Sequence, residues 1–229
     1  MKKVFIIILT VVMLTSNLTF ISYARSDTLP FVDINETAWY YDKVTWAYQN
    51  NIIFGINETE FCPQDMLTRE QAAMIFYNWS HSNENFDSYS FTDVKVGAWY
   101  CDAVEWAYRY GLMFGIGDDK FGVGQYITRQ DFITVIYRAY LKDSTREYGW
   151  LDTNFYNFRD HNKTSNYALE PMKFATGLVQ CILTNGMGGY EQPFVYGDNN
   201  NMLRPKDPCL RVEAVTIISN TNRIFLITQ

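Results

Sequence analysis

The stretch "MLTREQAAMIFYN" (residues 66–78) combines a helix start with an apolar stripe. Its apolar residues recur at the spacing of one helical face: Ala72, Ile75, Phe76 and, just beyond, Trp79. Thr68 is a typical N-cap residue, and Gln71 three positions later completes a capping-box pattern. Arg69 is therefore predicted to be the first helical residue. A cation is unfavourable there by about 0.3–1 kcal/mol, because the helix start carries a partial positive charge.

The same arginine returns sixty residues later. Residues 31–80 align with residues 91–140 without a gap, and seventeen of the fifty positions are identical. The shared residues include Phe-x-Asp, Ala-Trp-Tyr, Trp-Ala-Tyr, Phe-Gly-Ile and the Thr-Arg pair, which is Thr68-Arg69 in one copy and Thr128-Arg129 in the other. Such a period indicates tandem repeats that share one core.

Each copy is predicted to be a helix–loop–helix unit. The first helix places four residues on one face: Tyr40, Val44, Ala47 and Tyr48, or Tyr100, Val104, Ala107 and Tyr108. It should end at Asn51 or Gly111, two residue types that tolerate the left-handed conformation. A loop at Gly55 or Gly115 and a buried aromatic residue, Phe61 or Phe121, then lead to the Thr-Arg helix.

A third, degenerate copy is predicted over 155–225. Phe158-Arg159-Asp160 matches the start of the other repeats, and Tyr167 falls where they have Trp39 and Trp99. "LRPKDPCLRVEAV" (203–215) matches their second half and places Arg211 at the start of its helix. We expect the fifteen extra residues of this copy to lie within 184–201, a run rich in Gly and Asn. The preceding linker, 142–157, is also longer.

The N-terminal residues have the pattern of a secretory signal peptide. Two lysines precede an apolar run, Val4–Leu14, and Ser22-Tyr23-Ala24 is a typical cleavage site, which predicts a signal peptide over 1–24. An uncleaved anchor is the alternative. Cleavage changes the net charge from −6 to −8, which argues against nucleic acid as a partner. Membrane association is not expected after cleavage.

Neither a cofactor nor catalytic chemistry is indicated. His81 and His161 stand in no metal or triad pattern, and motifs such as Gly-x-Ser-x-Gly or His-Glu-x-x-His are missing. The four cysteines are Cys62, Cys101, Cys181 and Cys209. They lack the spacing of a zinc site and are expected to be core thiols or to form one incidental disulfide. The prediction is a non-enzyme without metal or cofactor.

Repeats one and two resemble the S-layer homology domain, as does the end of the third. The resemblance rests on "FVDINETAWYYDKVTWAYQNNIIFGI", "FTDVKVGAWYCDAVEWAYRYGLMFGIGDDKFGVGQYITRQD" and "LRPKDPCLRVEA". It implies an all-α fold in which three repeats form a pseudo-threefold bundle with grooves between them. It also implies an exported protein of a bacterial cell surface, held non-covalently to the wall by an anionic secondary cell-wall polysaccharide that often carries a pyruvate ketal.

The resemblance also assigns the ligand-binding residues. They are the Thr-Arg residues, the tryptophans and the loop glycines: Arg69, Arg129, Arg211, Thr68, Thr128, Trp39, Trp99, Gly55 and Gly115. The chemistry agrees, because an arginine fork suits a carboxylate and an indole offers a flat face to a sugar ring. A helix start adds unpaired N–H groups.

Structural interpretations of the same residues remain open. Arg69 and Arg129 could instead pair with acidic groups across a repeat interface, namely Asp33, Asp93, Asp42 or Asp102. Asp33 and Asp93 are most simply turn acceptors. Trp39 and Trp99 are expected to be partly in the core and partly in the groove, whereas Trp46, Trp106, Phe76 and Ile136 are expected in the core.

The function also has alternatives. In the third copy Leu210 replaces the capping threonine, so this repeat is expected to close the trimer rather than to bind sugar. Besides a wall-binding protein that recruits a cargo protein, the chain could be a degenerate module that acts as a surface protein–protein adaptor. A glycan-processing enzyme is a remote third hypothesis.

Overall fold

The computed structural model describes residues 29–142, 146–151, 154–183, 188–191 and 193–225. Each repeat contributes two α-helices to this part of the chain. The first helices are α1 (Tyr41–Gln49), α3 (Cys101–Arg109) and α5 (Leu169–Thr176). The second helices are α2 (Arg69–Trp79), α4 (Arg129–Lys142) and α6 (Arg211–Phe225). The predicted helical class is confirmed, and all three second helices begin at the predicted arginine.

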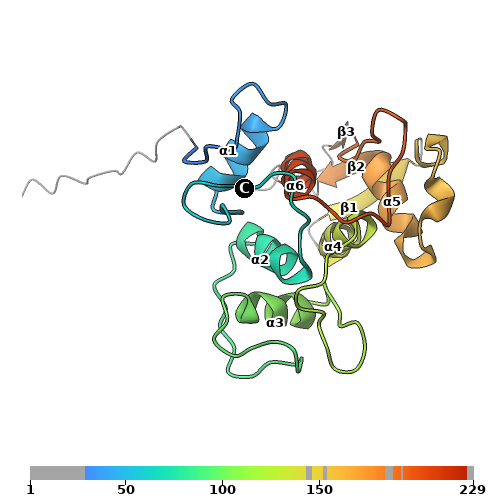
Figure 1. Cartoon of the computed structure of the whole chain (residues 1–229). Coiled ribbons are helices and arrows are strands. Elements are labelled where there is room, and N and C mark those ends of the chain that lie inside the picture. Colours follow the sequence, from blue (N-terminus) through green and yellow to red (C-terminus); the bar gives the residue numbers. More distant parts are fainter. Residues whose placement is uncertain (1–28, 143–145, 152–153, 184–187, 192, 226–229) are drawn as a thin grey trace, which may run out of the picture.

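The helices pack between repeats rather than only within them. Each second helix lies against the first helix of another repeat: α2 against α3, α4 against α5, and α6 against α1. In Figure 1 the second helices surround the middle of the molecule and the first helices lie outside them. Aromatic contacts support two of these pairs, with ring centroids 5.7 Å apart for Tyr77 and Trp106 and 4.2 Å apart for Tyr140 and Phe174.

A closed ring of backbone hydrogen bonds joins the three repeats just before the second helices. The N–H of Ile127 donates to the carbonyl of Leu67 at 2.9 Å, and Leu67 donates to Cys209 at 2.8 Å. Cys209 donates to Ile127 at 2.8 Å, which closes the ring. These residues are equivalent in the three repeats, each standing two before the arginine. The threefold symmetry of the whole bundle stays a prediction.

Buried residues hold the loop of each repeat in the same way. Phe61, Phe121 and Leu203 are fully buried at equivalent positions. An aspartate at the start of each repeat accepts hydrogen bonds from the backbone at and after them: Asp33 from Phe61 and Cys62, Asp93 from Phe121, Gly122 and Val123, and Asp160 from Leu203 and Arg204. Asp33 and Asp93 are therefore acceptors as expected, but of backbone N–H groups 28 to 30 residues away rather than of a local cap or turn.

Other local predictions can also be compared with the structure. Asn51 and Gly111 adopt the expected left-handed conformation, with φ of 58° and 59°. Phe76, Trp106 and Ile136 are buried as expected, but Trp46 is only partly buried. Cys62, Cys101 and Cys209 are free thiols. The side chain of Cys181 and the signal-peptide residues 1–24 lie outside the described part. No helix of the described part is both long and apolar enough to cross a membrane.

The third repeat carries a three-stranded antiparallel sheet that the sequence analysis did not predict. Its strands are β1 (Arg146–Leu151), β2 (Leu178–Leu183) and β3 (Gly188–Glu191), with β2 in the middle. Gly149 pairs with Gln180, and Cys181 pairs with Gly189. Three single-turn 3-10 helices lie between β1 and α5: Phe155–Asn157, His161–Lys163 and Asn166–Ala168.

The sheet corrects the position of the insertion. The N–H groups of Phe194 and Val195 donate to the carbonyl of Ala175, both at 3.1 Å. In the second repeat Leu112 and Met113 make the equivalent bonds to Ala107, at 2.8 and 3.0 Å. Fourteen of the extra residues therefore lie between Ala175 and Phe194, a span that shares only residues 184–193 with the predicted range of 184–201. The repeat pattern resumes at Phe194, so that Tyr196-Gly197 corresponds to Phe54-Gly55.

Candidate functional site: three hollows between the repeats

Three hollows lie between the repeats, and each is built from all three of them. A hollow takes a glycine loop and a second helix from one repeat, an aromatic side chain from the next and the helix-start arginine from the remaining one. We name each after that arginine. The loop glycine and aromatic residue are Gly55 and Trp99 in the Arg211 hollow, Gly115 and Tyr167 in the Arg69 hollow, and Gly197 and Trp39 in the Arg129 hollow.

The Arg211 hollow has a volume of about 340 Å³ and no carboxylate among its lining residues. Arg211 donates from Nε to the carbonyl of Phe61 at 2.8 Å and from Nη2 to that of Phe54 at 2.7 Å, and its guanidinium lies 4.7 Å from the centre of the Phe61 ring. Burial lowers the pKa of this guanidinium. Trp99, on the opposite repeat, is 60% exposed. This hollow thus combines an accessible indole with a buried cation that, among the described residues, forms no direct ion pair; Asp65 and Asp33 act on it only from a greater distance.

The remaining lining of the Arg211 hollow is mostly apolar. It consists of Ile52, Ile53, Phe54, Ile56, Met74 and Ile75, with Gln71 and Asn78 as the neutral polar residues. In such surroundings a charge interacts more strongly than in water. A ligand that fits this hollow would offer an anionic group to the arginine and apolar faces or methyl groups to the walls.

The Arg69 hollow is smaller, about 140 Å³, and contains two guanidinium groups. Arg69 donates to the carbonyls of Phe121 and Phe114 at 2.9 and 2.6 Å. Arg138 donates to the carbonyl of Leu112 at 2.8 Å. Burial lowers the pKa of both arginines. The hollow also contains one carboxylate, Asp131, which accepts the Tyr167 hydroxyl at 2.5 Å.

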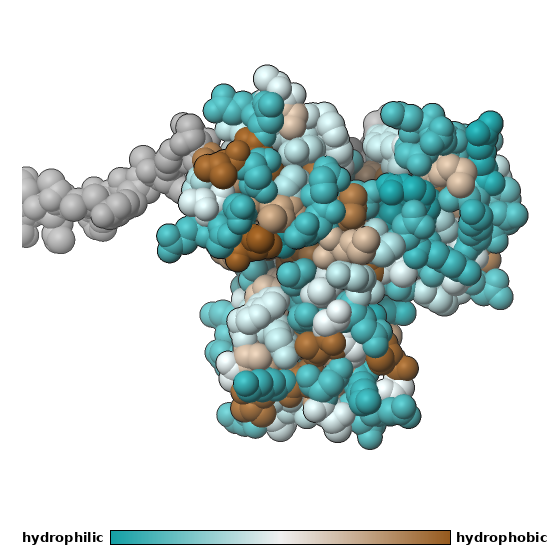
Figure 2. Space-filling model, viewed as in Figure 1, coloured by the Kyte–Doolittle hydropathy of each residue, from teal (hydrophilic) through white to brown (hydrophobic). Residues whose placement is uncertain are grey.

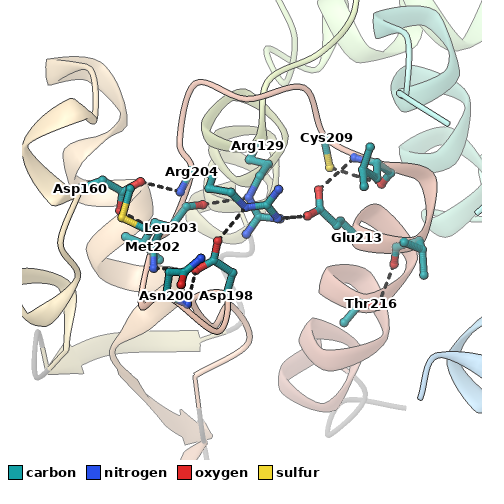
Figure 3. A network of polar contacts seen from close by, with 12 residues as sticks. Arg129, Asp160, Asp198, Asn200, Met202, Leu203, Arg204, Cys209, Glu213 and Thr216 are labelled. Atoms are coloured by element: carbon teal, nitrogen blue, oxygen red, sulfur yellow. Dashed lines mark hydrogen bonds and ion pairs between the residues drawn. The ribbon is translucent and has the colours of Figure 1, made fainter. Parts of the chain in front are cut away.

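The Arg129 hollow contains an internal ion-pair network. Its volume is about 340 Å³. Arg129 donates from Nε to the carbonyl of Leu203 at 2.9 Å, and its Nη1 lies 2.9 Å from Oε1 of Glu213 (Figure 3). The same Oε1 contacts Nη2 of Arg204, whose Nε lies 3.6 Å from Asp198. Two arginines and two carboxylates therefore share this hollow.

The structure brings most of the predicted site residues together. Arg69, Arg129, Arg211, Trp39, Trp99, Gly55 and Gly115 all line a hollow, but the tryptophan and the arginine of one hollow come from different repeats. Thr68 and Thr128 are not lining residues. At 68% and 60% exposure, Trp39 and Trp99 belong to the surface more than to the core.

Arg69 and Arg129 do not form the ion pairs that the structural interpretation of these arginines expected. Arg69 donates to backbone carbonyls, and the partner of Arg129 is Glu213 rather than Asp33, Asp93, Asp42 or Asp102. Asp102 instead accepts the Phe86 N–H and the Tyr89 hydroxyl. Arg129 is thus both a lining residue and a structural ion-pair partner.

The helix starts contribute less to the hollows than expected. The N–H groups of Arg69, Arg129 and Arg211 donate to backbone carbonyls of another repeat, at 2.9, 3.0 and 2.9 Å. Gln130 and Val212, the next residues of α4 and α6, do the same. These N–H groups are already paired, so the side chains of the arginines, rather than the helix starts, carry the positive charge of the hollows.

Several lining residues were missed in the sequence. Tyr196-Gly197 was placed in the insertion, although it precedes Arg211 by the same spacing as Phe54-Gly55 precedes Arg69. That spacing was the available signal. Arg138, Arg204 and Glu213 gave no signal of this kind, because their counterparts in the other repeats are different residue types. Among the described residues, no group of His, Cys, Asp and Glu could hold a metal ion.

Comparison with known proteins agrees with the repeat pattern. The family model described as the S-layer homology domain matches residues 30–73 and 90–133. Amylopullulanase of Thermoanaerobacterium thermosulfurigenes is 29% identical over 82% of this chain and 9% of its own length. The surface-layer 125 kDa protein of Lysinibacillus sphaericus is 34% identical over 48% of this chain and 10% of its own. The cellulosome-anchoring protein of Acetivibrio thermocellus is 25% identical over 70% of this chain and 33% of its own length.

The relatives carry the matched region as a minor part of longer proteins. The chain spans 9%, 17% and 16% of the amylopullulanase, an endoglucanase and an exoglucanase that it matches. Their enzymatic names therefore do not describe the matched region, which is an anchoring domain. Together with relatives named as surface proteins, this domain indicates a protein of the cell surface with a part in anchoring to the cell wall. The chain thus carries two segments that match the S-layer homology domain, at residues 30–73 and 90–133.

Proposed function

We propose that the protein binds an anionic polysaccharide of the cell wall non-covalently, through the Arg211 hollow and the Arg69 hollow. The main support is the Arg211 guanidinium. It is 5% exposed, it lines a hollow of about 340 Å³ without a lining carboxylate, and Trp99 stands at the same hollow. A buried cation without a direct ion pair is costly, and an incoming carboxylate would offset that cost.

Trp99 and the apolar walls explain why the ligand would be a sugar rather than a simple anion. An indole packs its flat face against the C–H groups of a pyranose ring and keeps an N–H at its edge. A pyruvate ketal combines a carboxylate with a methyl group, which fits an arginine beside Ile52, Ile53 and Ile75. The pyruvylated form of the polysaccharide is therefore the preferred ligand.

Co-sedimentation with purified wall sacculi tests the proposal. Arg211→Gln and Trp99→Ala should each weaken binding, and the double variant Arg69→Gln with Arg211→Gln should abolish it. Arg159→Gln is the matched control, because Arg159 is exposed and lines none of the hollows. Melting temperatures separate lost binding from lost folding. If the arginine variants do not fold, Trp99→Ala still tests the proposal, because Trp99 is exposed and its removal should not disturb the core. The proposal would be refuted if the folded Arg69→Gln, Arg211→Gln double variant and Trp99→Ala both bind sacculi as well as the wild type.

Exposed apolar side chains favour a protein–protein adaptor as the second candidate. Phe54, Ile56, Phe114 and Ile116 are each about half exposed, at 48–51%. Figure 2 shows hydrophobic patches on the lobes of the first two repeats, whereas the visible face of the third is mostly hydrophilic. Sacculi stripped of secondary polymer distinguish the candidates: a polysaccharide binder loses its target, and an adaptor for a wall protein does not.

A further inference from the structure

Arg138 occupies a helix position that is equivalent in the three hollows. It stands nine residues after the helix-start arginine of its repeat, and its counterparts are Asn78 and Asn220. Each of these side chains lines its own hollow and donates to an equivalent backbone carbonyl: Asn78 to Ile52 at 3.3 Å, Arg138 to Leu112 at 2.8 Å and Asn220 to Phe194 at 3.2 Å. The position therefore has the same structural role in each repeat, and the second repeat adds a positive charge to that role.

Phe114 brings the two guanidinium groups of the Arg69 hollow together. Its carbonyl accepts Nη2 of Arg69 at 2.6 Å, and the centre of its ring lies 4.8 Å from the guanidinium of Arg138. A guanidinium has five N–H groups. Bonds to carbonyls of the described chain use two of these groups on Arg69 and one on Arg138, so the remaining N–H groups of both side chains are available to a ligand.

The carboxylate of the Arg69 hollow is bonded to hydroxyl groups. Oδ1 of Asp131 accepts the Tyr167 hydroxyl at 2.5 Å, and Oδ2 accepts the Thr128 hydroxyl at 2.6 Å. Two guanidinium groups and one carboxylate give the lining residues a net charge of +1. The lining of the Arg211 hollow has the same net charge, but there it is carried by one guanidinium in a volume of about 340 Å³ instead of about 140 Å³. The Arg69 hollow is therefore the smaller of the two and the richer in hydrogen-bond donors.

We infer that the Arg69 hollow binds a phosphoryl group, whereas the Arg211 hollow binds the carboxylate of a pyruvate ketal. A carboxylate has two oxygens in one plane, and the fork of a single arginine pairs with both. A phosphoryl group has three acceptor oxygens that point in different directions, and as a monoester it carries about −1.5 to −2 charges at pH 7. Two guanidinium groups on different helices suit the phosphoryl group better than the carboxylate.

The size of the Arg69 hollow agrees with this assignment. A volume of about 140 Å³ admits a compact group and keeps an attached sugar ring outside, next to the exposed ring of Tyr167. The inference rests on the proposed function, since it assigns one group of the anionic polysaccharide to each hollow. Arg138 is then the residue that determines the difference in specificity between the two hollows.

Exchange of this residue between the hollows tests the inference. Arg138→Asn introduces the residue of the other two copies, which bonds the same carbonyl there, so the variant should fold. It should weaken phosphate binding at least about tenfold, the scale of one charged hydrogen bond, and leave binding of a pyruvylated sugar unchanged. Asn78→Arg brings a second guanidinium to the Arg211 hollow and should add a second phosphate site. The control is Arg159→Gln, which also removes one positive charge but lies outside the hollows.

The probes are inorganic phosphate, a hexose 6-phosphate and a methyl hexopyranoside with a 4,6-pyruvate ketal, each titrated calorimetrically into the full chain. One phosphate site that weakens in Arg138→Asn, but not in Arg159→Gln, supports the inference. Binding of the hexose 6-phosphate at that site assigns the phosphoryl group to a sugar polymer, and binding of inorganic phosphate alone assigns it to the free ion.

Two results overturn the inference. One is the absence of phosphate binding in the wild type, or the same phosphate affinity in the wild type and Arg138→Asn. The other is an equal loss of the phosphate and the pyruvylated probe in Arg138→Asn. If the wild type does not bind the pyruvylated probe and Arg211→Gln binds sacculi normally, the proposed function fails. The phosphate titrations of the wild type and Arg138→Asn still decide the inference in that case.

Discussion

The loops that border the hollows contain glycines at positions that leave no room for a side chain. A Cβ at Gly55 would lie 2.5 Å from the carbonyl oxygens of Asn57 and Glu60, and one at Gly115 would lie 2.6 Å from that of Lys120. These distances are below van der Waals contact, and backbone atoms cannot move aside cheaply. The loop glycines therefore act through packing, whatever they contribute to a ligand.

Gly55→Ala should lower the free energy of unfolding by about 1–3 kcal/mol, the range for overpacking a close-packed site. The comparison variant is Gly97→Ala. A Cβ at Gly97 meets no atom within 4 Å, and only its φ of 77° opposes the change. Its expected loss is about 1 kcal/mol. Chemical denaturation of both variants measures the difference, and a smaller loss for Gly55→Ala would contradict the packing role.

We expect Tyr167 to make the stability of the protein depend on alkaline pH. Burial and the hydrogen bond to Asp131 raise its pKa to about 12. In the unfolded chain the pKa of a tyrosine is that of a model peptide, about 10. The unfolded state therefore releases this proton first, and stability that is complete below pH 10 is lost as the pH rises toward 12.

Unfolding measured from pH 9 to pH 11.5 should show this loss. The wild type should lose more stability over that interval than Tyr167→Phe, which has no proton to release. Tyr156→Phe is the control, because Tyr156 is exposed to a similar extent, at 61% against 56%. Parallel curves for the wild type and Tyr167→Phe would show that the hydrogen bond to Asp131 is not retained in solution.

At the scale of residues, the positions of the helix-start arginines could be predicted from the sequence, but their contacts could not. Their helix-start position and their recurrence were sufficient to identify Arg69, Arg129 and Arg211. Their contacts could not be derived, because Arg211 bonds to carbonyls that lie 150 and 157 positions away in the chain. The repeat pattern also did not show that Arg211, from the degenerate repeat, lines the hollow whose loop and second helix come from the first repeat.

At the scale of elements, helices could be predicted and strands could not. An amphipathic stripe and a cap are local signals, so the starts of α2, α4 and α6 were correct to the residue. The pairing of β1 with β2 joins segments about thirty residues apart, such as Gly149 and Gln180, and such partners leave no local signal. The sheet was therefore missed by a prediction that located the starts of the three second helices.

The hairpin of β2 and β3 should be removable as a unit, whereas β1 precedes α5 and stays in the chain. Ala175 accepts hydrogen bonds from Phe194 and Val195, so the chain leaves and rejoins the repeat at neighbouring points. We expect that replacing residues 176–193 by the four-residue connection of the first repeat, Tyr48–Asn51, preserves cooperative thermal unfolding and the helical circular dichroism signal. A change of residues 57–60 to the same length of glycine and serine is a loop control. Loss of cooperative unfolding in the sheet variant alone would show that the sheet stabilises the core.

At the scale of the whole molecule, the ring makes distant parts of the chain depend on one another. The N–H of Leu67 needs the carbonyl of Cys209, and α1 packs against α6. Residues near the two ends of the described chain therefore meet, and contacts of such large sequence separation form late and are costly in chain entropy. The repeat period indicated three units, but it did not show which helix would pack against which.

Removal of the last repeat segment tests this dependence. A chain that ends at residue 204 lacks α6, and its first repeat should lose protection against amide hydrogen exchange at Leu67 and along α1. The second repeat, whose α3 packs against α2, should keep more of its protection. A peptide of residues 205–225 added in trans should restore the signal. Unchanged protection of α1 without α6 would contradict the interlocked arrangement.

The mixed origin of each hollow has a consequence for how such a protein can change over generations. Because each hollow takes its wall, its aromatic side chain and its guanidinium from three different repeats, no repeat can form a hollow by itself. Duplication of one repeat would leave mismatched parts, whereas a substitution in one repeat can change a hollow whose loop belongs to another. The three repeats are therefore expected to evolve together, because each hollow depends on all of them.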